Sequence, residues 1–187
     1  MEGKTVVISA PSGAGKTSIV NFLLSRIPSL SFSISACSRT KRLDEINGKN
    51  YYFLDSSTFK SKISKGDFLE WEEVYPDHYY GTLNSELERI WGENKHVVFD
   101  IDVAGGINVK KRFHSNCISI FILPPSVGAL EERLLSRGSE TQSSIDKRIN
   151  KAEQEIAKRS DFDHIVLNDD FTTACEEVLI LVKNFLK

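Results

Sequence analysis

A glycine-rich stretch near the start of the chain constrains its fold more than any other feature. Residues 10–17 read APSGAGKT and follow the apolar run 5–8 after a single residue, Ser9. A strand, such a loop and a helix in this order form a phosphate site, because the glycines let successive backbone N–H groups point inward. The positive end of the next helix, expected over residues 18–26, faces the same anion. The sequence therefore predicts a loop that binds the phosphates of a nucleoside triphosphate.

The residue types in this loop match the groups that they would contact. Lys16 is expected to reach the β- and γ-phosphates, and the Thr17 hydroxyl to ligate Mg²⁺. The alternative is a turn that binds no ligand, but turn chemistry alone does not require Lys-Thr at a helix start. The residues assigned to the donor nucleotide in this loop are Ser12, Gly13, Ala14, Gly15, Lys16 and Thr17.

The first position of the usual pattern, Gly-x-x-x-x-Gly-Lys-[Ser/Thr], is occupied by Ala10. Alanine does not easily adopt a positive φ. Either this position needs only a small side chain, or the entry to the loop is altered. The intact Gly15, Lys16 and Thr17 favour the first interpretation.

Length and composition limit the class of protein. A chain of 187 residues is long enough for one α/β domain with small inserted lobes. Its formal net charge of −2 argues against a general nucleic-acid binder, which usually carries a basic excess. The apolar runs have the length of strands, so we expect no membrane span.

The cysteines indicate the compartment. Cys37, Cys117 and Cys175 are widely spaced and follow no metal-ligand pattern, so reduced thiols are expected. The first strand begins within a few residues of the start, which leaves no room for a signal peptide. We expect a cytoplasmic protein, monomeric or homodimeric, whose partners are small-molecule substrates rather than nucleic acid or a membrane.

Strand-like and helix-like segments alternate along the chain. Short apolar runs, typical of strands buried on both faces of a parallel sheet, lie at residues 5–9, 96–101, 117–123 and 164–167. Helical patterns lie at residues 18–26, 83–91, 107–113, 127–137, 145–159 and 173–186. This alternation predicts a three-layer α/β fold with right-handed crossovers.

Two segments interrupt the alternation. Residues 35–82 contain aromatic, strand-like stretches and are interpreted as a small mixed lobe. Residues 125–158 are helical and charged, and they are interpreted as a lid over the phosphate loop, with a solvated surface as the alternative. The remaining core consists of residues 1–34, 83–124 and 159–187.

Several motifs in a fixed order show that the chain resembles the guanylate kinase family, whose members move the γ-phosphate of ATP onto GMP. They are the phosphate loop, Ser35-x-x-x-Arg39-Thr40-x-Arg42, Glu45-x-Asn47-Gly48-x-x-Tyr51, FLEW at 68–71, YYGT at 79–82, DID at 100–102, Arg133, Arg137-Gly138, Arg148 and NDD at 168–170. The resemblance covers essentially the whole chain. It implies the P-loop nucleoside monophosphate kinase fold, with a parallel sheet core, a GMP-binding lobe and a helical lid. It also implies ATP as phosphoryl donor and Mg²⁺ as cofactor.

A cluster of cations and hydroxyls fits a terminal monophosphate. Arg39 and Arg42 flank a short loop, and the planar guanidinium group binds phosphate bidentately. The resemblance assigns both arginines, with the hydroxyls of Tyr51 and Tyr80, to the phosphate of GMP. The alternative is that residues 39–42 form only a solvated basic turn.

Glu70 stands inside an aromatic and apolar stretch, where a buried carboxylate needs partners. Guanine offers the adjacent donors N1–H and N2–H₂ to one carboxylate, whereas adenine offers no such pair. The hydroxyls of Ser35 and Thr82 can donate to guanine O6, and the alternative is that Glu70 pairs with a nearby Lys or Arg. The GMP site implied by the resemblance consists of Ser35, Arg39, Arg42, Glu45, Tyr51, Glu70, Tyr80, Gly81, Thr82 and Asp102.

Asp100 ends the apolar run 97–99, and an acid at the carboxyl end of a buried strand holds Mg²⁺ or its waters in P-loop proteins. The metal site is therefore expected at Thr17 and Asp100. If the strand continues, Asp102 points to the same side, and the resemblance places it near the metal and GMP. Ala104 stands where the family commonly has Gln, a departure that we do not expect to abolish activity.

The expected lid carries arginines. Arg133 and Arg137 are four residues apart and share a helical face, and Arg148 lies on the next helix. Such cations can stabilise the charge that phosphoryl transfer spreads over the equatorial oxygens. The resemblance implies catalytic roles for these three, for Lys16 and for Arg39, and a contact of Arg137 with ATP. The alternative is surface ion pairs with neighbouring glutamates.

Asn168 follows the apolar run 165–167, and the resemblance implies that its amide binds adenine, with a turn asparagine as the alternative. The expected reaction is a direct in-line transfer from MgATP to GMP, and to dGMP in the same way, without a covalent intermediate. Two other functions stay open: an inactive interaction module of guanylate kinase type, and a kinase for another monophosphate. The intact Lys16 and Arg39 argue against the first, and Glu70 argues against the second.

Overall fold

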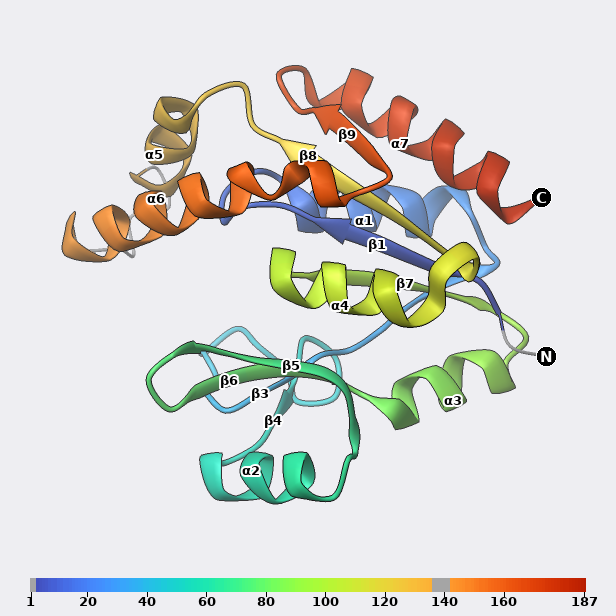
Figure 1. The fold of residues 1–187 in the computed structure, drawn as a ribbon, viewed down its shortest axis with the longest axis vertical. Coiled ribbons are helices and arrows are strands. Elements are labelled where there is room, and N and C mark those ends of the chain that lie inside the picture. Colours follow the sequence, from blue (N-terminus) through green and yellow to red (C-terminus); the bar gives the residue numbers. More distant parts are fainter. Residues whose placement is uncertain (1–2, 136–141) are drawn as a thin grey trace.

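A parallel sheet forms the centre of the structure, a computed structural model that describes residues 3–135 and 142–187 (Figure 1). Its strand order is β2-β7-β1-β8-β9, and all the pairings between these strands are parallel. The strands are β1 (Thr5–Ser9), β2 (Leu30–Phe32), β7 (His96–Ile101), β8 (Cys117–Leu123) and β9 (His164–Leu167). Four of them have the predicted bounds. The short strand β2 was not predicted.

Helices cover both faces of this sheet. Along β1, Val6 and Ile8 pack into one core cluster and Val7 into another, because successive side chains of a strand point to opposite faces. The first cluster lies under α1 (Lys16–Arg26) and α7 (Phe171–Leu186), and the second under α3 (Asn84–Gly92) and α4 (Val103–Phe113). The predicted three-layer α/β fold is therefore confirmed.

The start of α4 differs from the prediction. The helix was expected from residue 107, but it begins at Val103. Asp102 caps it by accepting a hydrogen bond from the backbone N–H of Gly105 at 2.8 Å. The adjacent Gly105 and Gly106 have low helix propensity, so the sequence pattern did not predict the first turn of this helix.

The other predicted helices lie close to their predicted positions, whereas α2 (Ser56–Ser64), inside the segment interpreted as a mixed lobe, was not predicted. Both α5 (Val127–Leu135) and α6 (Gln142–Ala157) fall within the segment interpreted as a lid, and they project to one side of the sheet in Figure 1. The expected end of the first of them, residues 136–137, lies outside the described residues. Two short 3-10 turns, η1 (His114–Asn116) and η2 (Arg159–Asp161), complete the helical elements of the described residues. In this part of the chain we find no helix with the length and apolar character needed to cross a bilayer.

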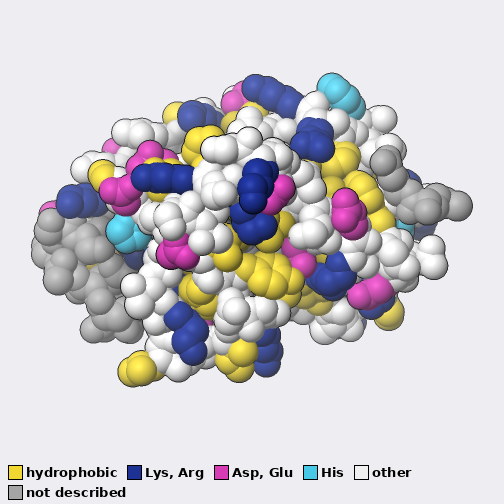
Figure 2. All heavy atoms as spheres, turned by 90° about the horizontal axis from the view of Figure 1, so that it is seen from below, with side chains coloured by type: hydrophobic (Ala, Val, Ile, Leu, Met, Phe, Trp, Pro, Cys, Tyr) yellow, Lys and Arg dark blue, Asp and Glu magenta, His cyan; other side chains and the backbone are white. Residues whose placement is uncertain are grey.

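A second sheet with mixed strand directions lies below the first in Figure 1. Its order is β4-β3-β6-β5, with β3 (Ala36–Cys37), β4 (Tyr52–Phe53), β5 (Phe68–Tyr75) and β6 (His78–Leu83). The helix α2 (Ser56–Ser64) closes a small aromatic core, in which Phe59 stacks on Phe68 with ring centroids 4.3 Å apart. Seen from below, basic and acidic side chains are interspersed over the surface, and apolar side chains gather near its middle (Figure 2).

Candidate active site

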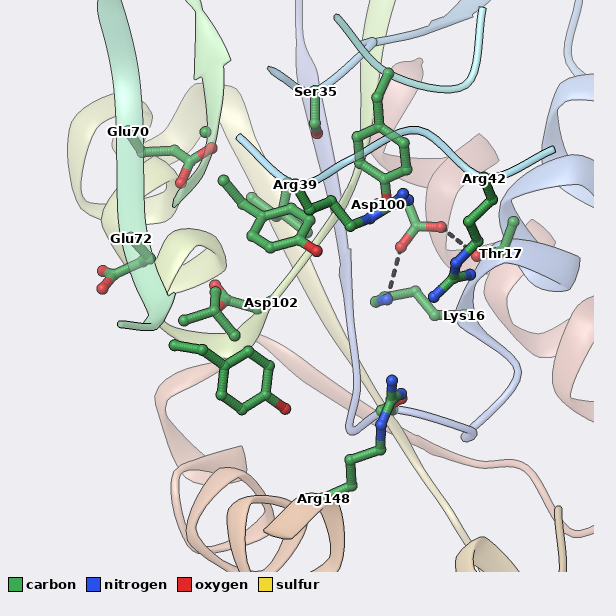
Figure 3. Close-up of a pocket in the computed structure, with 17 residues that line it drawn as sticks. Lys16, Thr17, Ser35, Arg39, Arg42, Glu70, Glu72, Asp100, Asp102 and Arg148 are labelled. Carbon is green, nitrogen blue, oxygen red and sulfur yellow. Dashed lines mark hydrogen bonds and ion pairs between the residues drawn. The ribbon is translucent and has the colours of Figure 1, made fainter. Parts of the chain in front are cut away.

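A cavity of about 300 Å³ is lined by residues of the phosphate loop, the carboxyl end of β7 and the second sheet (Figure 3). Ligands of parallel α/β proteins bind at this end of the strands. The lining residues are Ser12, Lys16, Thr17, Ser35, Arg39, Arg42, Tyr51, Glu70, Glu72, Val74, Tyr75, Tyr80, Gly81, Asp100, Ile101, Asp102 and Arg148. Most of the site residues expected from distant parts of the sequence thus meet around one cavity.

The phosphate loop has the backbone that its glycines allow. Gly13 and Gly15 have φ values of 92° and 93°, in the left-handed region. A Cβ on Gly15 would lie 2.6 Å from Nδ2 of Asn168, so this position also needs a glycine for space. Ala10 is 3% exposed and is not among the residues with positive φ. The first position of the loop therefore needs only a small side chain.

Asp100 organises the first turn of α1. Its Oδ1 lies 2.7 Å from Nζ of Lys16, and its Oδ2 accepts a hydrogen bond of 2.6 Å from the Thr17 hydroxyl (Figure 3). Burial alone would lower the pKa of Lys16, but the Asp100 carboxylate raises it above its ordinary value, so Lys16 is charged. The hydroxyl and carboxylate oxygens of Thr17 and Asp100 converge here, and such hard oxygen ligands suit Mg²⁺.

Glu45 holds Arg39, one of two neighbouring arginines that line the cavity. Its carboxylate forms a bidentate ion pair with the Arg39 guanidinium and accepts a 2.8 Å hydrogen bond from the backbone N–H of Arg42. The Arg39 hydrogen bond is the main reason why the pKa of Glu45 falls to about 2. The guanidinium carbon also lies 5.0 Å from the centre of the Tyr51 ring. Arg39 is therefore fixed in orientation and is not part of a merely solvated turn.

Tyr51 and Tyr80 stand edge to face beside these arginines, with ring centroids 6.1 Å apart. Burial raises the pKa of both phenols. Their hydroxyl groups therefore stay protonated at neutral pH and can donate hydrogen bonds to an anion in the cavity.

Glu70 is a buried carboxylate, 8% exposed, on β5. Its Oε1 accepts a 2.7 Å hydrogen bond from the Thr82 hydroxyl, and its pKa rises to about 7, chiefly because burial disfavours the charged form. Among the described residues, no lysine or arginine lies within ion-pair distance of it. In Figure 3 its carboxylate points into the cavity, where it is open to a ligand with N–H donors.

The condition under which Asp102 would point to the same side as Asp100, a strand that continues past Ile101, is not met. The strand β7 ends at Ile101, and Asp102 is the N-cap residue of α4. Both carboxylates nevertheless line the cavity. The Oδ2 atom of Asp102 faces Nζ of Lys151, a residue of α6, at 3.8 Å.

The expected lid arginines lie in different places. Arg148 donates a 2.9 Å hydrogen bond to the Ser12 hydroxyl of the phosphate loop. Arg133 donates a 3.3 Å hydrogen bond to the backbone carbonyl of Asn168. Arg137 lies outside the described residues. Asn168 is buried, and its amide donates a 2.7 Å hydrogen bond to the backbone carbonyl of Ala14. This hydrogen bond links the end of β9 to the phosphate loop.

Sequence reasoning missed three charged residues around the cavity. Glu72 lines it from β5, and its position two residues after Glu70 on the same strand face is a signal that could have identified it. Lys151 and Glu155 lie 3.5 Å apart on α6. They follow the expected Arg148 by three and seven residues and so share its helical face, a signal that could have identified them. Burial and the neighbouring Asp102 both raise the pKa of Glu72 and of Glu155.

The cavity is electrostatically polarised. Figure 3 shows Glu70, Glu72 and Asp102 on one side of it, and Lys16, Arg42 and Arg148 on the other. A phosphate loop after β1, an acid at the end of β7 and a facing acidic pocket define a class of protein: P-loop kinases that hold a small second substrate against the nucleotide.

Comparisons with known proteins specify the family. A sequence model described as guanylate kinase matches residues 2–184, and the chain belongs to the guanylate kinase family. The guanylate kinase of Bacteroides fragilis is 44% identical over 185 residues, which cover 99% of this chain and 91% of that protein. The guanylate kinase of Porphyromonas gingivalis is 46% identical over 184 residues, 98% of each protein. The crystal structure of guanylate kinase from Anaplasma phagocytophilum matches with a TM-score of 0.79 at 27% identity, over 99% of this chain and 87% of that one.

Proposed function

We propose that this chain is an ATP:GMP phosphotransferase, which moves the γ-phosphoryl group of MgATP onto GMP, and onto dGMP, to give ADP and the nucleoside diphosphate. Membership of the guanylate kinase family and about 45% identity to proteins of that name support this activity. The observation that carries it is the polarised cavity, with Lys16 of the phosphate loop at one end and, at the other, the buried Glu70, which forms no ion pair with any described residue. The proposal includes Mg²⁺ as cofactor and a cytoplasmic protein that acts on these small molecules alone.

Guanine is selected at the acidic end of the cavity. The Glu70 carboxylate accepts hydrogen bonds from N1–H and the exocyclic amine of guanine. The Thr82 hydroxyl, which donates to Oε1 of Glu70 in the structure, turns its single O–H to the base when GMP binds. Ser35 and Thr82 are assigned to guanine O6, with Asp102 and the backbone of Gly81 beside the base. Adenine would leave the buried carboxylate without donors, and an unpaired buried polar group rejects a wrong ligand strongly.

The phosphate of GMP is held between the two ends. Arg39 and Arg42 bind its oxygens as cations, and the hydroxyls of Tyr51 and Tyr80 donate to them. Glu45 contributes by holding the fork of Arg39 in one orientation before the substrate arrives. Because Arg39 is already ordered, GMP binding does not include the entropic cost of ordering this side chain.

The donor nucleotide occupies the phosphate loop. The backbone of residues 12–17 and the Lys16 ammonium group bind the phosphates of ATP, and Thr17 and Asp100 hold Mg²⁺. Mg²⁺ neutralises charge on the β- and γ-phosphates when it is bound. Asn168 and Arg137 are assigned to the nucleotide as well, and Arg133 and Arg148 to the charge of the transferred group.

The transfer is direct and in line, because the phosphate of GMP is itself the nucleophile. No covalent intermediate with a side chain is required, and positioning with charge stabilisation does most of the catalysis. We propose that the lobe of residues 35–82 and the lid of residues 125–158 close over the core of residues 1–34, 83–124 and 159–187. Closure excludes water and so suppresses hydrolysis of ATP.

The test is an ADP-release assay with MgATP and either GMP, dGMP, AMP, UMP, CMP or no acceptor. We expect turnover with GMP and dGMP and almost none with the others. Turnover with a different monophosphate would overturn the role of Glu70. The absence of turnover with every acceptor, despite measurable ATP binding, would favour an interaction module without activity.

A matched pair of variants tests the guanine site. Glu70→Gln keeps the shape of the side chain but replaces an acceptor oxygen by a donor amide, so we expect KM for GMP to rise by about a hundredfold or more while ATP binding is retained. Glu88→Gln makes the same change at an exposed position on α3 and should behave as wild type. Equal losses for both substrates in Glu70→Gln would contradict the assignment.

A further inference from the structure

One face of α6 contacts both ends of the cavity. Arg148 donates to the Ser12 hydroxyl in the phosphate loop at 2.9 Å, which is the donor end. Lys151, three residues later and therefore on the same helical face, places its Nζ 3.8 Å from Oδ2 of Asp102, which is the acceptor end. Glu155 follows one turn further on and lies 3.5 Å from the same Nζ atom. This helix thus bridges the two substrate sites through charged side chains.

The carboxylates at the acceptor end favour a cation at the position of the Lys151 ammonium group. Glu70 and Glu72 line this end from β5 and Asp102 from the start of α4, and Glu155 of α6 lies beside Lys151 at 3.5 Å. These carboxylates are partly or wholly buried, so their mutual repulsion is only weakly screened by solvent. Burial raises the pKa of Glu155, and the Lys151 ammonium group opposes this rise. Lys151 is thus the counter-charge of these carboxylates, which we call the acceptor wall.

The geometry of Asp102 makes the contact specific. Its Oδ1 atom is already engaged by the backbone N–H of Gly105 at 2.8 Å, so the carboxylate is held at the end of α4. Its Oδ2 atom is the one that faces Lys151. A cation on this side orients the carboxylate, and it also draws α6 towards α4. The position of Lys151 therefore affects both the acceptor wall and the placement of Arg148.

We infer that Lys151 is a positioning residue for the transfer reaction: its ion pair with Asp102 docks α6 on the acceptor wall and thereby sets Arg148 against the phosphate loop. This inference rests on the proposed function. According to this inference, α6 connects Lys151 at the acceptor end with Arg148 at the donor end. A ligand bound at the acceptor end therefore affects the position of Arg148. Lys151 acts through Asp102 and Arg148 and does not itself touch the reacting phosphate.

The test compares steady-state kinetics of Lys151→Met with those of wild type, with GMP and ATP varied in turn. We expect kcat to fall and KM for GMP to rise, each by about fivefold, with KM for ATP unchanged. Lys151→Arg keeps the charge and should restore most of the loss. Lys147→Met removes an exposed lysine of the same helix and should behave as wild type.

A double-mutant cycle identifies the partner. In an Asp102→Asn background, Lys151→Met should have little further effect on KM for GMP, because the ion pair is already lost. Additive effects in the cycle would overturn the inference, and so would a Lys151→Met variant with unchanged kinetics or with equal changes for both substrates. Failure of wild type to phosphorylate GMP would instead refute the proposed function, so the two failures are distinguishable.

Discussion

The buried carboxylate of Glu70 should make the stability of the protein depend on pH, and the neutral variant Glu70→Gln should remove that dependence. The side chain is 8% exposed and its pKa is raised from 4.5 to about 7, chiefly by burial. The variant keeps the size of the side chain and an oxygen that can accept from Thr82. It differs from the wild type mainly in that it cannot ionise.

The magnitude follows from the two pKa values. A shift of about 2.5 pKa units corresponds to about 3 kcal/mol between the two protonation states. Because the folded-state pKa lies above the unfolded one, the folded state holds the proton more tightly. The associated stability is fully present below about pH 4.5 and is lost as the pH rises through 7. Near pH 8 the wild type should therefore be less stable than Glu70→Gln by up to about 3 kcal/mol, whereas below pH 5 the difference should be small.

Thermal unfolding without nucleotides, at pH 5, 6, 7 and 8, measures this difference. For a chain of this size we expect Glu70→Gln to melt about 6 to 12 °C above wild type at pH 8 and close to it at pH 5. The exposed Glu88→Gln should follow wild type throughout. A gap between Glu70→Gln and wild type that does not change with pH would refute the reasoning, as would a variant that is less stable at pH 8.

Three further predictions concern the same site. GMP binding at pH 7 should release about half a proton, because guanine donors favour the ionised Glu70, and calorimetry in buffers with different ionisation enthalpies should show it; a binding enthalpy that is the same in all buffers would contradict this. Gly105→Ala should raise KM for GMP by about tenfold without affecting ATP binding, because its Cβ would lie 2.7 Å from Oε2 of Glu70, whereas Gly92→Ala, with no atom within 4 Å of the new Cβ, should behave as wild type. Glu45→Gln should lower the free energy of unfolding at pH 7 by about 1 kcal/mol, since it breaks the ion pair with Arg39. The pKa of Glu45 is lowered to about 2, so the stability it contributes is present above about pH 4.5 and is lost as the pH falls towards 2. Urea unfolding of Glu45→Gln and wild type should therefore converge below pH 3, and a gap that persists there would refute the ion pair as its cause.

Most of the fold could be predicted from local patterns. The strands β1, β7 and β8 have the expected bounds because each is an apolar run of strand length, largely buried in a parallel sheet. The strand β9 also has the expected bounds, but it lies at the edge of the sheet, where Ile165 and Leu167 are exposed. The strand β2 was missed because its three residues carry too short a pattern. The start of α4 was missed because two glycines suggested a loop, while the cap at Asp102 and packing against the sheet stabilise a helix there.

The site residues divide in the same way, into those that local sequence patterns identified and those that only tertiary packing brought together. The phosphate loop is contiguous in the sequence, so its residue types and spacing alone determined a nucleotide phosphate site around Lys16 and Thr17. The ordered motifs further along the chain identified the family. They also marked Glu70, whose apolar neighbours indicated a buried carboxylate.

Only the tertiary structure decided which of these groups meet and how each is paired. Asp100 joins Lys16 to Thr17, Glu45 holds Arg39, and α6 brings Lys151 to within 3.8 Å of Asp102. No local pattern encodes such contacts, because they depend on how helices and strands distant in the sequence pack together. The sequence by itself therefore determined the chemistry that is present, and the packing of α6 and the second sheet against the phosphate loop decided the electrostatics of the cavity in which that chemistry takes place.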